Sequence, residues 1–144
     1  MAQIVVRTRF LDDALLRAVR TAHQVVIVAA GMDARAYRLA WPDGAVVYEL
    51  DQPAVIAAKN DVLADDDPRC RRVAVGVDLA DDWPTALTES GFDPNAPTVW
   101  LIEGLLQYLD EARCGRCSIA CTACRRPGRP CCTTSSARRC SSRR

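Results

Sequence analysis

The feature that most constrains the fold is an unbroken apolar run that ends at a single glycine, Gly31. The run and the residues after it read VVIVAAGMDARAYRL over positions 25–39. An acidic residue, Asp51, closes the next apolar run 20 positions after the glycine. A buried strand, a glycine turn and an acid at the end of a second strand are typical of a nucleotide-type cofactor site in a parallel α/β sheet.

Composition divides the chain into two parts. Residues 1–111 contain all 18 acidic residues and ten basic ones, whereas residues 112–144 contain nine arginines and no acid. Seven of the eight cysteines also lie in the second part. With 144 residues, 49% of them hydrophobic, the chain has material for one globular domain. Such asymmetry indicates a tail of separate purpose or origin, so the two parts are interpreted separately.

Strands and helices are predicted to alternate in the acidic part. Apolar residues on one helical face predict a first helix over roughly 11–21. Proline and turn signals predict helices over 53–63 and 84–91. Runs rich in β-branched residues predict four strands, at 25–29, 46–50, 73–77 and 98–102. Because runs such as VVIVAA are apolar on both faces, we expect an α/β fold with a partial, doubly wound Rossmann-like sheet of about four parallel strands.

The glycine count distinguishes between cofactors. A dinucleotide site needs several glycines, because the pyrophosphate approaches the backbone and a helix N-terminus. Here Ala29 and Ala30 precede Gly31, and alanines also follow it. S-adenosylmethionine carries no phosphate, so a single glycine at the turn suffices. The pattern therefore favours the methyl donor over NAD.

Five strings in order resemble the motifs of one family. They are RTRFLDDALL, VVIVAAGMDARAYRL, VVYELDQP, RRVAVGVDLADDWPTAL and VWLIEGLLQYL, which together cover about residues 5–109. The sequence resembles S-adenosyl-L-methionine-dependent methyltransferases of an actinobacterial group related to leucine carboxyl methyltransferases. The resemblance implies S-adenosyl-L-methionine as cofactor and methyl transfer to a carboxylate or hydroxyl acceptor that the sequence does not identify.

The resemblance also implies roles for residues after the first three strands. Gly31 would belong to the turn that lets the methionine moiety approach, and Asp51 would bind the ribose. The pair Asp78 and Leu79 is similar to the family's adenine-contacting pair. Each polar residue also has a purely structural alternative. Gly31 could serve only the turn, Asp51 could cap the helix at Pro53, and Asp78 could cap its own turn.

Two further residues are assigned to the methionine end by the resemblance. Arg7 would meet the cofactor's carboxylate through a charge-assisted contact, and Glu103 would be the acid after the fourth strand. Arg7 could otherwise be a surface charge or a partner of Asp12. Ala29 stands where the family's motif often has its first glycine, and we expect the added methyl group to weaken binding slightly.

No catalytic residue is predicted. The single histidine, His23, falls between the first helix and the first strand, away from the strand ends where ligands collect. In-line attack on a sulfonium methyl depends mainly on positioning and desolvation, so a catalytic base is not required for a carboxylate acceptor.

The tail contains a CxxC-x3-CxxC motif formed by Cys114, Cys117, Cys121 and Cys124. Its spacing could ligate zinc or an iron–sulfur cluster. The surrounding segment has almost no apolar periodicity, and the chain has one lysine against eighteen arginines. We therefore favour the hypothesis of a disordered tail from GC-rich coding DNA read out of frame, over a metal site or a basic segment that binds nucleic acid.

These observations predict an incomplete cofactor-binding domain at 1–109 and an Arg/Cys/Ser-rich tail at 110–144. We expect a truncated methyltransferase with impaired activity. The alternatives are a non-catalytic nucleotide-binding fragment, or a metal- or nucleic-acid-binding module in the tail. A small-molecule cofactor and a methyl acceptor are the expected partners, with self-association through the exposed edge of the fourth strand. Without an 18-residue apolar run, we expect no membrane partner and a cytoplasmic location.

Overall fold

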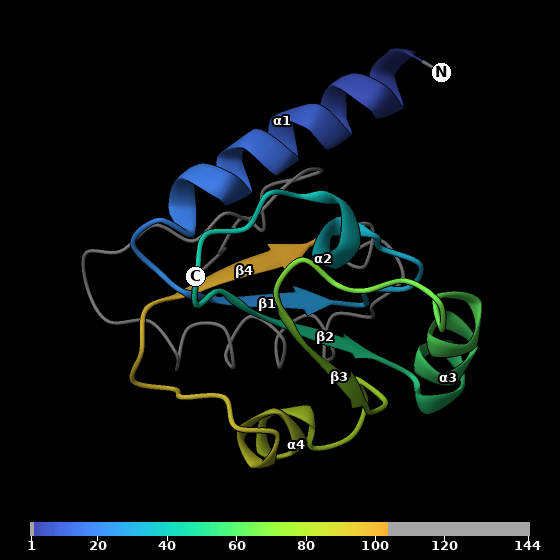
Figure 1. Cartoon of the computed structure of the whole chain (residues 1–144). Helices are drawn as coiled ribbons and strands as arrows, with labels where there is room; N and C mark the ends of the chain where they lie inside the picture. The colour runs from blue at the N-terminus through green and yellow to red at the C-terminus, as the bar shows by residue number, and fades with distance from the viewer. Residues whose placement is uncertain (1, 104–144) are drawn as a thin grey trace, which may run out of the picture.

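Helices and strands alternate along the chain in the computed structural model, which describes residues 2–103 (Figure 1). Their order is α1 (Ala2–Ala18), β1 (Gln24–Val28), α2 (Arg35–Arg38), β2 (Val46–Asp51), α3 (Pro53–Val62), β3 (Arg71–Gly76), α4 (Trp83–Glu89) and β4 (Thr98–Ile102). The predicted α/β class is confirmed. The predicted tail and its cysteine motif lie outside the described residues.

The four strands of the described part form one parallel sheet in the order β3-β2-β1-β4. Strand β1 is central, and Val25 pairs with Val47 on one side and with Val99 on the other. The chain proceeds from β1 outward to β3 and then returns past β1 to β4. The direction of winding therefore reverses between β1 and β4. Open α/β sheets bind their ligands at the carboxyl ends of the strands beside such a reversal.

The predicted strand bounds agree with the structure to within two residues. Strand β4 has the predicted bounds, and the largest difference is the start of β3 at Arg71 rather than near Val73. All five residues of β1 are buried. Strands of a parallel sheet that is covered on both faces are expected to show such continuous burial, so the apolar runs located them well.

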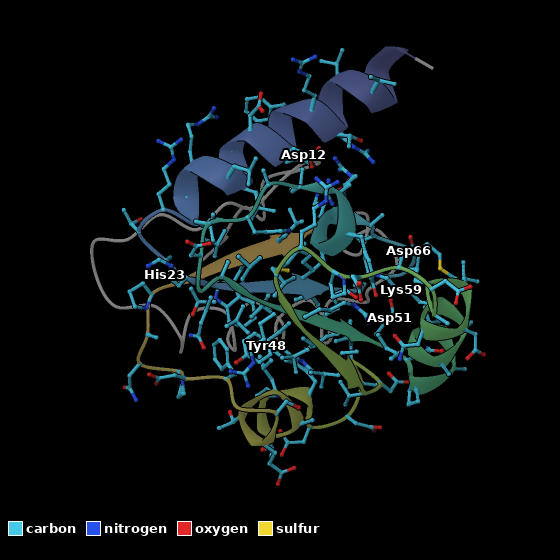
Figure 2. All side chains as sticks on the ribbon, in the orientation of Figure 1. Asp12, His23, Tyr48, Asp51, Lys59 and Asp66 are labelled. Atoms are coloured by element: carbon cyan, nitrogen blue, oxygen red, sulfur yellow. The ribbon has the colours of Figure 1, made fainter. Side chains whose placement is uncertain are left out.

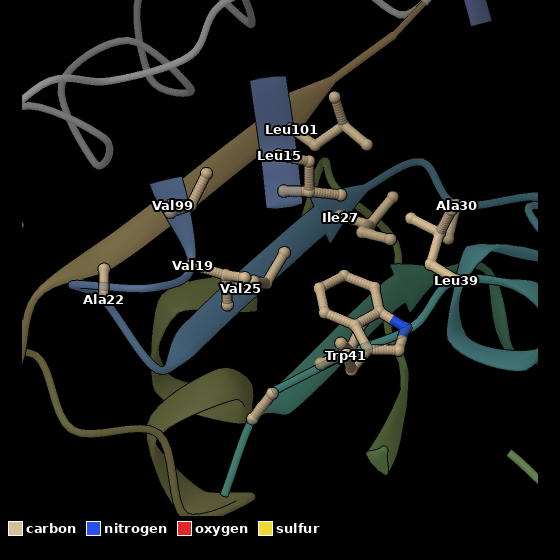
Figure 3. Close-up of a cluster of buried hydrophobic side chains, with 12 residues drawn as sticks. Leu15, Val19, Ala22, Val25, Ile27, Ala30, Leu39, Trp41, Val99 and Leu101 are labelled. Carbon is tan, nitrogen blue, oxygen red and sulfur yellow. The ribbon is translucent and has the colours of Figure 1, made fainter. Parts of the chain in front are cut away.

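Two apolar clusters cover the two faces of the sheet. Val25 and Ile27 face a cluster to which α1 contributes Leu15 and the turn after α1 contributes Val19, shown in Figure 3. Val26 and Val28 point to the opposite face, where α4 packs. That second cluster contains the edge-to-face aromatic pairs Trp83–Trp100, Phe92–Trp100 and Tyr48–Phe92. Burying one such side chain contributes about 1.5–3 kcal/mol, so the two clusters hold the helices to the sheet.

The expected start of the first helix is wrong by nine residues, because α1 begins at Ala2 rather than near Leu11. Leu11 and Leu15 are buried, whereas Val6 and Phe10 in the earlier half are exposed. The apolar stripe therefore marked only the half of the helix that packs. The earlier half contains neither proline nor glycine, so no residue in it opposes the helical backbone.

Local signals set the starts of α3 and α4. Pro53 occupies the first turn of α3, where its missing N–H would have no partner in any case. Asp82 caps α4 by accepting a hydrogen bond from the backbone N–H of Thr85 at 3.4 Å. Gly76 ends β3 where a Cβ would lie 3.2 Å from the Cα of Pro53, so the strand approaches α3 closely. These contacts fix the carboxyl ends of β2 and β3 beside each other.

Within residues 2–103, β4 pairs with β1 alone, and its second edge has no partner strand from this part of the chain. Self-association through that edge stays a prediction. The helices between residues 2 and 103 include none with the length and apolar character that crossing a bilayer requires.

Candidate functional site

The residues predicted to bind a cofactor follow the carboxyl ends of the four strands. Gly31 follows β1, Asp51 is the last residue of β2, Asp78 follows β3 and Glu103 follows β4. Because the strands are parallel, all four positions lie at the same end of the sheet, where the strands have their carboxyl ends; we call this end the carboxyl edge. Figure 2 shows Asp51 at that edge and His23 at the other end of the strands. His23 is exposed there, away from the candidate site.

Asp51 connects the end of β2 to the glycine turn. Its Oδ2 accepts a hydrogen bond from the backbone N–H of Gly31 at 2.7 Å, and its Oδ1 accepts one from the N–H of Gln52 at 2.7 Å. The N-cap residue of α3 is Gln52, which makes no side-chain capping bond. The capping alternative for Asp51 is therefore not what the structure shows. The carboxylate instead joins two strand ends that are 20 residues apart in sequence.

The turn after β1 is conformationally demanding. Gly31 has a φ of 48°, and Ala29 has a φ of 55°, so both residues are left-handed. Glycine adopts this region freely, but an L-residue with a Cβ pays about 1–2 kcal/mol for it. From the sequence, we expected only that the methyl group of Ala29 weakens ligand binding slightly. The structure shows in addition that Ala29 has an unfavourable backbone conformation, which the sequence did not reveal. A Cβ built on Gly31 meets no atom within 4 Å, so the space over the turn is open.

Asp78 and Leu79 lie in the turn between β3 and α4. The exposed Asp78 accepts a hydrogen bond through Oδ1 from the N–H of Ala80 at 2.8 Å, which is the local capping contact considered as its alternative. Leu79 is half-buried and packs against the aromatic cluster. The N–H of Val77 donates to the carbonyl of Asp51 at 2.8 Å, which ties this turn to the end of β2. No side-chain contact in residues 2–103 joins Asp78 to Asp51.

Arg7 and Glu103 form an ion pair, with Nη2 of Arg7 2.8 Å from Oε1 of Glu103. The structure therefore brings these two predicted residues together, although α1 and β4 lie at opposite ends of the described chain. The alternative pairing of Arg7 with Asp12 is not formed. The side chain of Arg7 is 48% exposed and that of Glu103 is 22% exposed, so solvent and ligands can reach the pair.

Arg35, at the start of α2, is a site residue that sequence reasoning missed. Its side chain is buried and donates to Asp12 at 2.8 Å, to Glu103 at 3.1 Å and to Asp33. It thus joins α1, the turn after β1 and the end of β4. Burial alone would lower the pKa of its guanidinium, but the carboxylates of Asp33, Asp12 and Glu103 raise that pKa above its ordinary value. Only its place four residues after the glycine could have indicated this role.

The ion pairs of Asp12 hold α1 against the turn. Asp12 accepts from both guanidinium nitrogens of Arg38, at 2.6 and 2.9 Å, in addition to Arg35. Burial raises the pKa of the Asp12 carboxyl, but hydrogen bonds and charge from Arg38 and Arg35 outweigh burial and leave that pKa below its usual value. The carboxylate is therefore ionised in the folded protein near neutral pH. Arg35 thus connects the Asp12–Arg38 ion pair to Glu103.

Metal binding finds no support in the described part of the chain, where no three His, Cys, Asp or Glu residues are grouped closely enough to hold an ion. The four cysteines of the CxxC-x3-CxxC motif lie beyond residue 103, so that alternative remains a prediction. The edge of the sheet offers carboxylates, a guanidinium and backbone groups. Such a set can bind hydroxyls and a charged amino acid group through hydrogen bonds and ion pairs.

Comparison with known proteins gives one family. The model of the leucine carboxyl methyltransferase family matches residues 1–118. A protein of Mycolicibacterium smegmatis is 56% identical over 110 residues, which are 74% of this chain and 36% of the relative. Proteins of Mycolicibacterium gilvum and Mycobacterium avium are each 52% identical over 88% of this chain, and over 44% and 42% of their own lengths. All three carry the provisional name S-adenosyl-L-methionine-dependent methyltransferase. The chain spans less than half the length of these relatives.

Proposed function

Because the chain belongs to the leucine carboxyl methyltransferase family, we propose that its carboxyl-edge site binds S-adenosyl-L-methionine for methyl transfer to a carboxylate or hydroxyl acceptor. The cofactor supplies the electrophilic methyl group on its sulfonium. The chain's own residues hold the cofactor and fix its orientation, which is the main requirement of an in-line transfer.

The geometry of Asp51 carries the proposal. A carboxylate oxygen can accept two hydrogen bonds, and each oxygen of Asp51 uses one of them for a backbone N–H. One acceptor position therefore remains on each oxygen, which matches the two hydroxyls of a ribose. The two backbone donors also fix the orientation of the carboxylate before the ligand arrives.

The Arg7–Glu103 pair suits the amino acid end of the cofactor. That end is a zwitterion, with a carboxylate and an ammonium on one carbon. A guanidinium 2.8 Å from a carboxylate presents the complementary charges at matching separation. Glu103 keeps a second donor in Arg35, at 3.1 Å, so it stays oriented when Arg7 turns to the ligand.

The adenine is proposed to bind beside Asp78 and Leu79. Leu79 offers apolar surface next to the aromatic cluster, and Asp78 offers an exposed carboxylate in the same turn. The turn follows β3, whose last residue, Gly76, pairs with Asp51 across the sheet. The adenine position is therefore adjacent to the ribose position along the edge.

The turn after β1 disfavours a dinucleotide. A pyrophosphate binds where a glycine-rich turn leads directly into a helix N-terminus, whose dipole attracts the negative charge. Here α2 has four residues and begins four positions after Gly31. A helix this short has a weak dipole, and the carboxylate of Asp33 already accepts from the backbone N–H of Arg35 at the start of α2, a donor that a phosphate would use. These features support a cofactor without phosphates.

The remaining predictions are part of the same proposal. Residues 1–109 form the cofactor-binding unit, and residues 110–144 form a separate tail. We expect the site to function in the cytoplasm, where its cofactor is available. We also expect copies of the chain to associate through the edge of β4 that has no partner strand within residues 2–103.

Equilibrium dialysis of the purified chain with methyl-labelled S-adenosyl-L-methionine tests the proposal. We expect saturable binding that S-adenosylhomocysteine displaces, because it shares the ribose, adenine and amino acid groups. NAD at the same concentration should leave the bound label unchanged. Absence of saturable binding, or displacement by NAD, would contradict the assignment.

A further inference from the structure

A buried ion group behind the glycine turn is not used by the proposed ligand contacts. Glu49 on β2 and Lys59 on α3 have side chains that are 0% and 1% exposed. Oε2 of Glu49 accepts from Nζ of Lys59 at 2.8 Å and from Nε of Arg72 on β3 at 2.8 Å. Two cations thus share one carboxylate. In Figure 2, Lys59 and Asp51 lie toward the same end of the strands, the carboxyl end of the sheet.

A lysine is a costly choice for this position. Removing an ammonium from water carries a large desolvation penalty, and apolar residues of similar volume often replace a buried ion pair without loss of stability. If the side chain at this position only filled space, leucine or methionine would do so at a lower free-energy cost. Lys59 differs from these residues in one useful respect, since its ammonium can donate several hydrogen bonds in different directions.

The second acceptor of Lys59 shows where that capacity is used. Nζ donates to the backbone carbonyl of Asp33, in the turn that follows β1. This turn contains Gly31, whose N–H orients Asp51, and Ala29, whose left-handed backbone is unfavourable. Other bonds also hold the turn, among them those from the N–H of Ala30 to the carbonyl of Leu50 at 3.0 Å and from the N–H of Asp33 to the carbonyl of Ala30 at 2.8 Å, and those from Arg35 to the carboxylate of Asp33. The bond from Lys59 is the one that ties the turn to α3 and β2 through a buried side chain.

We propose that Lys59 is a positioning residue for the cofactor site, which holds the turn over residues 29–34 in its binding conformation with Glu49 as its anchor. The ammonium connects α3, β2 and the turn through two acceptors. The ligand consequence rests on the proposed function, because it assumes that the turn contacts S-adenosyl-L-methionine. The effect on the turn itself does not depend on any ligand.

Lys59→Met tests this role, because methionine keeps an unbranched side chain of similar volume and removes the donor. Arg72→Met is the matched control, since it removes the other cation from the same carboxylate and Arg72 donates no hydrogen bond to residues 29–34. Its other contacts are with Asn60 on α3 and the ring of Tyr37 on α2. In ligand-free protein, hydrogen–deuterium exchange of the amides over residues 29–35 should rise about tenfold in Lys59→Met and change little in Arg72→Met. Exchange in the centre of β1 should be equal in both variants.

The double variant Glu49→Gln with Lys59→Met protects the test against misfolding. It removes both charges of the buried pair, while the amide oxygen at position 49 still accepts from Arg72. It lacks the donor to Asp33, so the turn should exchange as fast as in Lys59→Met. Unchanged exchange over residues 29–35 in both Lys59 variants would overturn the inference.

Ligand binding separates this inference from the proposed function. If the unmodified chain binds S-adenosyl-L-methionine, Lys59→Met should raise the Kd about tenfold or more, and Arg72→Met should raise it less than about twofold. Equal losses in the two variants would overturn the positioning role and leave the cofactor assignment intact. A chain that binds no S-adenosyl-L-methionine would refute the proposed function, and the exchange measurement would still decide the role of Lys59.

Discussion

Replacing Arg35 with methionine should destabilise the protein by about 3 kcal/mol. Removing one partner of a buried ion pair costs about 3–5 kcal/mol, because the remaining charge is left unpaired. Arg35 has three carboxylate partners, but each keeps another donor: Asp12 keeps Arg38, Glu103 keeps Arg7, and Asp33 keeps a backbone N–H at 2.7 Å. The lower end of the range therefore applies.

Urea unfolding followed by tryptophan fluorescence measures this loss. Arg38→Met is the control, since it also removes a donor to Asp12 but its side chain is 42% exposed, and exposed pairs contribute at most about 1 kcal/mol. The difference in unfolding free energy between Arg35→Met and the wild type should become smaller as the pH falls below the ordinary Asp12 pKa of 3.8. Protonation of Asp12 then removes the negative charge that Arg35 stabilises. A loss of unfolding free energy below about 1 kcal/mol, or equal losses in the two variants, would refute the claim that the buried Arg35 stabilises the fold through its three carboxylate partners.

Two further predictions follow. Ala29→Gly should stabilise the protein by about 0.5–1 kcal/mol in the same urea assay, because relief of the left-handed backbone exceeds the entropy gained by the unfolded chain. The control Ala30→Gly should destabilise the protein, and destabilisation by Ala29→Gly would contradict the backbone strain at Ala29. Burial raises the pKa of the Cys70 thiol from its ordinary 9.0 to about 11. Iodoacetamide should therefore label the Cys70 peptide slowly at pH 8, as followed by mass spectrometry, and faster as the pH rises toward 11. Because the thiol of the unfolded chain ionises at lower pH than the folded one, the free energy of unfolding should also fall above about pH 9. Labelling of Cys70 in the folded protein at pH 8 as fast as in urea would contradict the raised pKa.

The sequence located the strands and the site edge because both depend on local patterns. Continuous β-branched runs are the direct consequence of a sheet covered on both faces, so β1 and β4 were placed to within one residue. Asp51 was predicted as a ligand because it closes such a run, and the structure places it against Gly31. In parallel sheets the end of a strand is also the place of the site, so one pattern predicts both.

The ion pairs could not be predicted because they join residues that are far apart in the chain. Arg35 meets Asp12 across 23 positions and Glu103 across 68. Neither spacing follows from a helix or strand period, so no local pattern reveals which charges are buried together. For Lys59 the sequence is misleading, because a lone lysine in a short helix normally faces solvent. In the structure Lys59 is fully buried.

The short α2 shows how a tertiary contact ends a helix that propensity would continue. Residues after Gly31 are good helix formers, yet the helix spans only Arg35–Arg38. Leu39 is extended, and the buried ring of Trp41 donates through Nε1 to the carbonyl of Arg35 at 2.9 Å. Burial of Leu39 and Trp41 in the cluster under α1 therefore takes priority over helix extension.

The most direct test of the account is calorimetric titration of S-adenosyl-L-methionine into the wild type, Asp51→Ala and Asp61→Ala. Asp61 is an exposed acid on α3 and serves as the matched control. If Asp51 binds the ribose through both carboxylate oxygens, Asp51→Ala should raise the Kd at least about tenfold while Asp61→Ala leaves it unchanged. Thermal melting verifies that both variants fold. Binding to folded Asp51→Ala that is as tight as to the wild type would contradict the central claim.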